Sequence, residues 1–279
     1  MPKFIQFYIA AFVILVGIRP VFAEELPLYE LGLGIGGLIT PHYLGAAQDH
    51  HLLVPIPYII YRGKWLRADG SGIKTFLVDK KRFDLNISFH ASLPVNSSDD
   101  KARHGMPDLD LMLEIGPTLR YTAWRSHDGD KRLRLDLPVR VAISAAGLNL
   151  DYQGLTASPG FIYFSKIKNW NWTASYAAIF GNRRYHGYFY DVDPAFATAQ
   201  RPQYRARAGY TASRFTLSAT RRYGNWLVGG FVRYYSLLGA ANEASPLVKK
   251  DGNLSAGFML VWFFKQSKTT VSRDPEARF

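Results

Sequence analysis

The chain contains no cysteine among its 279 residues. Disulfide frameworks, thiolate zinc sites, iron–sulfur clusters and cysteine nucleophiles are therefore excluded. After Glu24 it also lacks an apolar run long enough for a membrane-spanning helix, which needs about 18 residues or more. Acidic residues are few, with 22 aspartates and glutamates against 34 lysines and arginines, so the chain is basic. An apolar fraction of 48% is too high for a disordered chain, and a folded protein is expected.

Residues 1–23 resemble a secretory signal peptide. Lys3 precedes an almost wholly apolar stretch over residues 4–18, and residues 21–23 fit the small-x-small rule for cleavage. The alternative is an N-terminal membrane anchor, but the run is shorter than the roughly 20 residues of a spanning helix, and Arg19-Pro20 interrupts it. We therefore expect removal of this segment, which takes away two basic residues and leaves an exported chain with a net charge of +10.

Several later segments alternate apolar and polar side chains with a period of two. The alternation is unbroken over residues 82–92, and it recurs over residues 108–115 and 132–143, on either side of the turn-like residues 126–130. This pattern is typical of transmembrane β-barrels, in which one face of each strand meets lipid and the other a polar lumen. Secreted β-sandwiches also contain such strands, so alternation alone does not decide between the two.

Three further features favour the membrane barrel. The chain has the length of a medium barrel, and its strands are expected to be longer than the roughly 5 to 6 residues usual in soluble domains. Aromatic residues also crowd the segment ends, as the two membrane interfaces require. These aromatic residues are Tyr58, Tyr61, Tyr121, Trp124, Trp170, Trp172, Tyr185, Tyr188, Tyr190, Tyr234, Tyr235 and Trp262.

We therefore predict an all-β protein, an antiparallel transmembrane β-barrel of about 12 strands over residues 24–264. A count of about ten stays possible because residues 182–203 and the break at residues 211–213 are ambiguous. No domain boundary or fixed repeat is visible, and residues 265–279 form a charged tail. The strands are expected at residues 28–39, 51–62, 64–78, 82–93, 107–125, 131–146, 150–166, 170–181, 205–212, 214–222, 224–238 and 252–264.

This strand order predicts which loops share a side of the membrane. An even number of strands places both ends of the barrel in the periplasm. Residues 40–50 and 239–251 then face outward, whereas residues 94–106 face the periplasm. That loop is unusually long for the periplasmic side, where turns are normally short. We therefore predict that a periplasmic partner docks on it, and that deleting residues 98–104 abolishes partner binding.

Several motifs resemble the MipA/OmpV family of outer-membrane proteins. Those near the start are Gly32–Gly37, Pro41–Gly45, Pro55–Tyr61 and Arg67–Gly70. Those near the end, which resemble the family's penultimate strand and following loop, are Asn225–Leu227, Arg233-Tyr234, Leu237–Ala241 and Ser245–Val248. Together they cover nearly all of the chain from residue 24 to Phe264.

The resemblance implies a barrel in the outer membrane of a Gram-negative bacterium. It implies a scaffold of the MltA-interacting type, which links a lytic transglycosylase that degrades murein (peptidoglycan) to a murein synthase, or else a surface-exposed antigen or adhesin. Two departures stand out. His42 follows the first proline where the family commonly has an acidic residue, and residues 265–279 follow the terminal aromatic strand. The tail either hangs in the periplasm or offers Phe279 as the aromatic residue that the assembly machinery reads.

No motif predicts a cofactor or a metal. Gly32–Gly37 lacks the strand–turn–helix context of a dinucleotide fingerprint, and glycines that relieve crowding in a strand explain it better. His42, His50 and His51 lack the spacing and the helix of a zincin, so we interpret them as surface-loop histidines. We therefore expect no cofactor-binding residue and no metal ligand.

No motif predicts catalysis either. Asp99-Asp100 with His104, or Asp108 and Asp110 with His90, could form a hydrolase site at a barrel rim. Adjacent acids point to opposite faces of a strand, however, and no serine has a nucleophile-elbow setting. We expect a protein without enzymatic activity.

Charge suggests two further roles. Basic clusters could meet lipid and lipopolysaccharide phosphates at the outer rim, or could line the lumen and loops, whereas the export signal argues against nucleic acid. These clusters are Lys80–Arg82, Lys131–Arg134, Arg183-Arg184, Arg221-Arg222 and Lys249-Lys250. The alternative to a scaffold is a narrow porin-like barrel that passes small polar solutes through a charged interior. That interior would comprise Arg82, Asp84, Asp110, Glu114, Arg132, Arg134 and Arg140.

Overall fold

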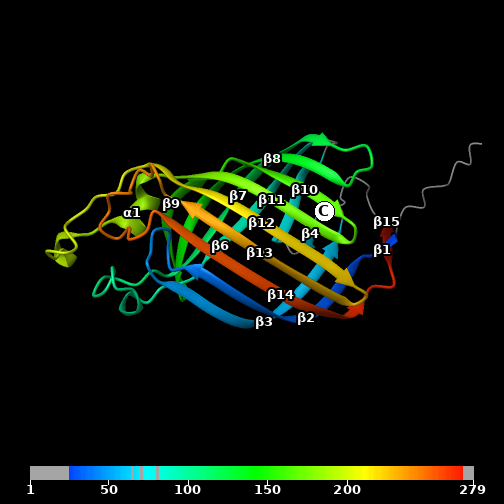
Figure 1. Ribbon diagram of the computed structural model, residues 1–279, viewed down its shortest axis with the longest axis horizontal. Helices are drawn as coiled ribbons and strands as arrows, with labels where there is room; N and C mark the ends of the chain where they lie inside the picture. The colour runs from blue at the N-terminus through cyan, green and yellow to red at the C-terminus, as the bar shows by residue number, and fades with distance from the viewer. Residues whose placement is uncertain (1–24, 64–65, 70–71, 80–81, 273–279) are drawn as a thin grey trace, which may run out of the picture.

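Antiparallel strands wrap into a barrel, as Figure 1 shows. This computed structural model describes residues 25–63, 66–69, 72–79 and 82–272. Long loops and helix α1 (Arg183–Tyr190) gather at one end of the barrel in Figure 1, and β1 and β15 lie at the other. No helix within these ranges is long and apolar enough to cross a membrane. The predicted antiparallel β-barrel is confirmed.

Within the described ranges, 13 strands form one sheet in the order β10-β11-β12-β13-β14-β2-β3-β4-β5-β6-β7-β8-β9. Strand β8 closes the sheet, because it pairs with β10 along its first half and with β9 along its second. Their bounds are β2 (Tyr29–Pro41), β3 (Asp49–Arg62), β4 (Leu66–Asp69), β5 (Gly72–Asp79), β6 (Phe83–Ser92), β7 (Leu111–Arg125), β8 (Lys131–Ala146), β9 (Asn149–Ala157), β10 (Gly160–Ile167), β11 (Trp170–Gly181), β12 (Gly209–Tyr223), β13 (Trp226–Ser236) and β14 (Gly252–Gln266). Strands β9 and β10 are thus two halves of one position, so the described sheet has twelve positions.

The predicted number of strands, twelve, agrees with the twelve positions because two errors in the predicted strand map offset each other. Residues 64–78, expected as one strand, contain the hairpin β4–β5, in which Asp69 pairs with Gly72. Residues 205–212 and 214–222, expected as two strands, contribute to the single strand β12. The small polar residues of the expected break continue the strand because Thr211 and Ala212 are buried beneath the loops rather than exposed in a turn.

The extra hairpin changes the side on which the next loop lies. Residues 93–110 occupy the same end as residues 42–48 and 237–251, because Val95 packs in one cluster with Tyr43 and Leu247. The long loops of bacterial barrels are extracellular and their periplasmic turns are short. The prediction that residues 94–106 face the periplasm and dock a partner there is therefore wrong.

The expected alternation is found on the strands. On β6, Phe89 is 57% exposed on the outer face, whereas the neighbouring His90 lines the lumen. Near the periplasmic end, exposed aromatic side chains form an outward band that includes Trp124, Trp226 and Trp262. Such a band fits the membrane interface.

Not all of the predicted interface aromatics belong to this band. Tyr190 and the neighbouring Tyr185 and Tyr188 lie on α1, inside the loop end. Tyr58 stacks edge-on with Phe263 in the lumen, at a centroid distance of 5.8 Å. The prediction is wrong for these residues because helix and lumen packing also recruit aromatic side chains.

Strand β3 carries two prolines in an otherwise regular ladder. Its pairing with β2 is continuous through Pro55 and Pro57, which have no N–H to donate. The missing donors must therefore point away from β2. On that other side β3 pairs, within the described ranges, only at Tyr61 and Arg62. Proline is tolerated where a strand has no neighbour to bond, which fits this border.

The described chain ends meet below the barrel. Strand β1 (Glu25–Pro27) pairs antiparallel with β15 (Thr270–Ser272), and Leu28 N donates to the Thr269 carbonyl at 2.9 Å. The first part of the expected tail thus completes β14 and forms β15. The expected signal peptide, residues 1–23, and the end of the tail with Phe279 lie outside the described residues.

Two glycines of β2 give a matched test of the fold. A methyl group at Gly34 would collide with the Leu260 carbonyl of β14, whereas one at Gly37 meets only the exposed ring of Phe258. Gly34→Ala should lower barrel stability by about 1–3 kcal/mol, and Gly37→Ala should cost less because the ring can move. The measurement is the temperature at which the compact gel band of unboiled outer-membrane protein converts to the unfolded band. Equal transition temperatures for both variants would contradict this β2–β14 register.

Candidate functional site

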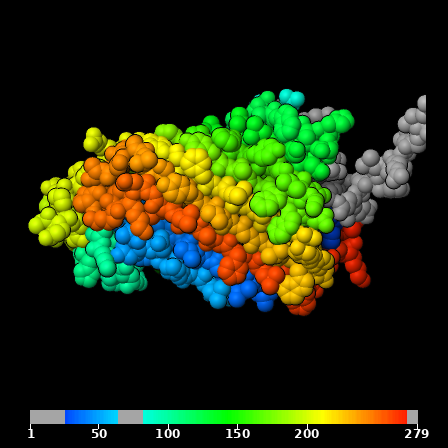
Figure 2. Space-filling model, viewed as in Figure 1, coloured from blue at the N-terminus to red at the C-terminus, as the bar shows by residue number. Residues whose placement is uncertain are grey.

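Four loops close the extracellular end of the barrel as a packed body, which we call the cap. It comprises residues 42–48, 93–110, 182–208 and 237–251. Figure 2 shows the orange, teal and yellow-green loops in contact at this end. The cap has its own hydrophobic core, made of Tyr43, Ala46, Val95, Ala102, Leu109, Tyr190, Val192, Ala206 and Leu247. Burial of this apolar surface holds the loops together.

Helix α1 is anchored in the cap at both ends. It begins at the N-cap Asn182, whose side chain accepts a hydrogen bond from Tyr185 N at 2.9 Å. At the other end the Tyr190 hydroxyl donates to the Leu44 carbonyl at 3.0 Å, and the Ser245 hydroxyl donates to the Tyr190 carbonyl at 2.9 Å. The helix therefore joins three of the four loops.

Asp100 organises a second part of the cap. Its carboxylate is fully buried and accepts hydrogen bonds from Ala102 N and Arg103 N. His42 Nδ1 lies 3.0 Å from Asp100 Oδ2. This contact gives His42 a structural role, because an acidic residue at that position would face a buried carboxylate. Asp100 is thus committed to loop packing and not to a paired-acid site with Asp99.

His186 is a buried histidine in the middle of α1. Its side chain is 0% exposed, and its two ring nitrogens meet the Arg207 carbonyl and the Thr211 hydroxyl, the latter at 2.7 Å. Burial lowers the pKa of His186 below its ordinary value, opposed by the hydrogen bond to Arg207. The neutral ring can donate through Nδ1 and accept through Nε2, so both contacts are satisfied without a charge.

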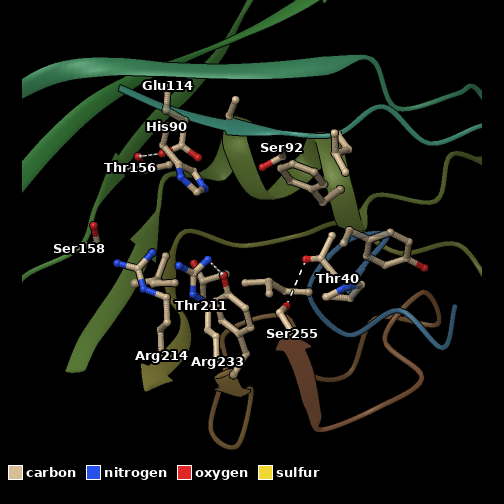
Figure 3. Close-up of a pocket in the computed structure, with 18 of the residues that line it drawn as sticks. Thr40, His90, Ser92, Glu114, Thr156, Ser158, Thr211, Arg214, Arg233 and Ser255 are labelled. Carbon is tan, nitrogen blue, oxygen red and sulfur yellow. Dashed lines mark hydrogen bonds between the residues drawn. The ribbon is translucent and has the colours of Figure 1, made fainter. Parts of the chain in front are cut away.

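A cavity of about 300 Å³ lies in the lumen directly beneath the cap (Figure 3). Arg214 on β12 and Arg233 on β13 form one wall, and His90 on β6 and Glu114 on β7 lie opposite. Arg140 on β8 completes this charged ring. The cavity is lined further by hydroxyl groups and by apolar and aromatic side chains, namely Leu38, Thr40, Leu44, Ser92, Thr156, Ser158, Ile179, Tyr185, Phe189, Tyr190, Thr211, Phe231, Tyr235 and Ser255.

Below the cavity, paired charges fill the lumen. Arg134 donates two hydrogen bonds to the Asp136 carboxylate, at 2.6 and 2.9 Å. Arg120 lies 3.7 Å from the same carboxylate and 3.8 Å from Asp84. Buried charges of both signs neutralise one another here, as a low-dielectric interior requires.

The structure supports most of the predicted charged interior and corrects two members. Arg132 is buried and stacks on the Phe164 ring, so it belongs to the lumen with the residues above. Arg82 instead lies exposed just before β6, and Asp110 lies just before β7, where its N–H donates to the Tyr188 hydroxyl. Both fall beyond the ends of the strands, so alternation does not turn them inward.

Glu30 is the centre of an ion-pair cluster at the periplasmic end of the lumen. Its buried carboxylate forms ion pairs with Arg62 at 2.6 Å and with Arg222 at 2.5 Å. Arg222 also lies over the ring of Phe263, which is 1% exposed. This cluster could not be predicted from local sequence patterns, because its three charges come from β2, β3 and β12.

The remaining residues considered from the sequence do not form a site. Gly32 to Gly37 lie inside β2 against β14, as expected of glycines that relieve crowding. His50 and His51 are on β3 rather than in a loop, and the His50 ring lies 4.5 Å from that of His42. The described residues contain no group of three or more metal-type ligands.

The basic clusters divide between the two ends of the barrel. Arg183-Arg184 and Lys249-Lys250 lie in the cap, at the outer rim, whereas Lys131–Arg134 and Arg221-Arg222 lie at the periplasmic end of β8 and β12. Contact with lipopolysaccharide phosphates is thus open only to the first two of these four clusters.

An antiparallel barrel with an apolar outer face, an aromatic band and a polar, capped lumen is an outer-membrane β-barrel protein. The chain belongs to the family described as "MltA-interacting protein MipA", whose family model matches residues 33–264. The resemblance seen in the sequence is thereby confirmed. The protein is located in the outer membrane of a Gram-negative bacterium.

Three solved structures are similar in fold. The CymD monoaromatic hydrocarbon channel is 11% identical with a TM-score of 0.38, covering 85% of this chain and 89% of that chain. A FadL homologue of Pseudomonas aeruginosa is 9% identical with a TM-score of 0.36, covering 90% and 74%. A porin is 12% identical with a TM-score of 0.29, covering 85% and 100%. No curated protein matches the chain.

The lowered pKa of buried His186 predicts that the cap becomes less stable in acid. Because its folded-state pKa is lowered, the open cap takes up a proton first as the pH falls below about 6.5. Cap stability should therefore be constant above that pH and be lost below it. Hydrogen exchange of the amides of residues 183–190 measures this, and His186→Gln should exchange faster at pH 7.5 but with a weaker pH dependence. An unchanged pH dependence in His186→Gln would sink the assignment.

The cap and the Glu30 cluster predict a barrel that conducts no steady current. We expect the purified protein to be silent in a planar lipid bilayer, because packed loops lie over one end of the lumen and ion-paired side chains lie at the other. A stable, ohmic unit conductance in the unmodified protein would contradict this.

Proposed function

We propose that this barrel acts as a scaffold that binds a murein-degrading transglycosylase at its periplasmic end and links it to a murein synthase. The family description supports the first partner, since it names an interaction with MltA. The observation that carries the proposal is the packed cap at one end of the lumen together with the ion-paired Glu30 cluster at the other. A closed barrel acts through its surface, and the scaffold needs only that surface.

The periplasmic end offers such a surface. The two-stranded sheet β1–β15 lies below the barrel, and no third strand of the described ranges pairs with it. The turn between β12 and β13 lies at the same end of the barrel, because Asn225 O accepts a hydrogen bond from Phe263 N near the end of β14. Unpaired strand edges are a ready template for an extended segment of another protein. We assign the transglycosylase contact to this sheet and turn.

Passage of small polar solutes is the second candidate function. The charged lumen and its cavity favour it. Passage of solutes requires both the cap and the Glu30 cluster to open, whereas a scaffold works without any such opening.

Two matched turns allow a test of the scaffold. Gly224 and Gly147 both occupy short hairpin turns with positive φ, at 55° and 61°, and both have open space around them. Gly224 lies at the periplasmic end, and Gly147 lies at the extracellular end. Inserting the same epitope after Gly224 should reduce recovery of the transglycosylase with the full-length protein by about tenfold or more, equivalent to about 1.4 kcal/mol.

The same insertion after Gly147 is the control and should leave recovery unchanged. The heat-dependent gel shift of each variant verifies that the barrel is folded. Equal recovery with both insertions, or loss only with the extracellular one, would refute the assigned surface. Failure of the unmodified protein to retain any transglycosylase would refute the scaffold itself.

A further inference from the structure

We infer that the lumen cavity is a binding site for a small organic dianion. The cavity brings Arg140, Arg214 and Arg233 together beneath the cap, with Glu114 as its acidic member (Figure 3). Its three arginines and one glutamate leave the cavity with two more positive than negative charges. This site lies far from the periplasmic surface assigned above and is independent of the scaffold.

Among the described residues, no carboxylate forms an ion pair with these three arginines. Their hydrogen bonds go to neutral hydroxyls: Arg140 Nε donates to Ser88 at 2.9 Å, and Arg233 Nε donates to Thr216 at 3.1 Å. The layer below shows the contrast, because Arg120 and Arg134 there share Asp136. Uncompensated charge in a closed lumen is costly, and a bound anion removes that cost.

Glu114 does not neutralise the three arginines by ion pairing. Its Oε2 accepts a hydrogen bond from the Thr156 hydroxyl at 2.9 Å, and its Oε1 accepts one from the Tyr185 hydroxyl at 3.3 Å. The carboxylate thus connects the barrel wall to α1 of the cap and forms no ion pair with the arginines of the described lumen. It leaves the guanidinium groups opposite it free to receive a ligand.

The lining fixes the class of ligand. Guanidinium groups bind carboxylate and phosphate oxygens with paired hydrogen bonds. Hydroxyls of Thr40 and Ser255, which lie 3.1 Å apart, add polar contacts, and Leu38 and Phe231 add apolar ones. A volume of about 300 Å³ is at the lower end for small-molecule sites. This combination fits a small carbon skeleton with two negative charges better than an inorganic ion.

The ligand exchanges through motion of the cap. The cap roof over the cavity includes Tyr185, Phe189 and Tyr190 of α1, and the Glu30 ion pairs lie at the other end of the lumen. Loop openings of this kind occur at the low end of the free-energy range of local unfolding. A bound dianion that contacts both walls stabilises the closed cap by mass action.

The test is calorimetric binding to the full-length folded protein in neutral detergent at low salt. Succinate is the dicarboxylate probe, and glycerol 3-phosphate is the organic phosphate probe. Inorganic phosphate tests whether an ion without a carbon skeleton is sufficient, and succinamide tests whether a molecule of similar shape binds without charge. Succinate or glycerol 3-phosphate should bind at least about tenfold more tightly than inorganic phosphate, and succinamide should not bind. The stronger of the two identifies the acidic group. Absence of binding for both dianions, or equal binding of inorganic phosphate, would overturn the proposal.

Three variants connect binding to the cavity. Arg214→Gln should weaken binding by about tenfold or more, whereas Arg134→Gln, an arginine already paired below the cavity, should change it less than about twofold. Glu114→Gln should instead strengthen binding, because it removes the one negative charge of the cavity while keeping a polar side chain. A merely structural role of Glu114 predicts a loss. Unchanged affinity in Arg214→Gln or weaker binding in Glu114→Gln would overturn the site.

Discussion

A chain that crosses lipid with strands must pair most of its backbone N–H and C=O groups, because the hydrocarbon core offers no water to replace them. The closed sheet follows from this constraint, and most of the structure follows from the closed sheet. Side chains must alternate between lipid and lumen. Each strand or hairpin also decides on which side of the membrane the next loop lies. The β4–β5 hairpin shows how much depends on one turn, since it moves residues 93–110 from the periplasm to the cap.

Inside the barrel, the ion pairing of the arginine side chains differs from one level of the lumen to the next. Near the periplasm Glu30 is shared by two arginines, and at mid-height Asp136 is shared by two others. Beneath the cap three arginines meet only one carboxylate, and that carboxylate is occupied by Thr156 and Tyr185. Glu30 and Asp136 in the lower layers are thus ion-paired with arginines, whereas the three arginines of the uppermost layer form no ion pair with a described carboxylate.

The sequence predicted the parts of the fold that depend on local pattern. Period-two alternation identified the lipid face, and the position of each strand near residues 82–92 and 131–146 agrees with β6 and β8. The hairpin near Asp69 and Gly72 was missed because both arms are short, and a short strand carries little periodicity. The cap was missed for another reason. Its core joins residues such as Tyr43, Val95 and Leu247 from separate loops, and no local pattern records such packing. The charged ring was seen only through Glu114 and Arg140, because Arg214 and Arg233 lie on strands whose alternation is interrupted by small residues.

The pairing of β2 with β14 also has a consequence for the order of folding. Thr40 and Ser255, which bond across this seam, are 215 residues apart in the chain, and Tyr43 bonds to Leu247 at a separation of 204 residues. Contacts so distant in sequence form late, after the loop-closure entropy of the whole chain has been overcome. Neither the barrel nor the cap can therefore be completed before β14 is available. Until then β2 and β14 remain open edges, so the chain needs protection from aggregation during export until its final residues arrive.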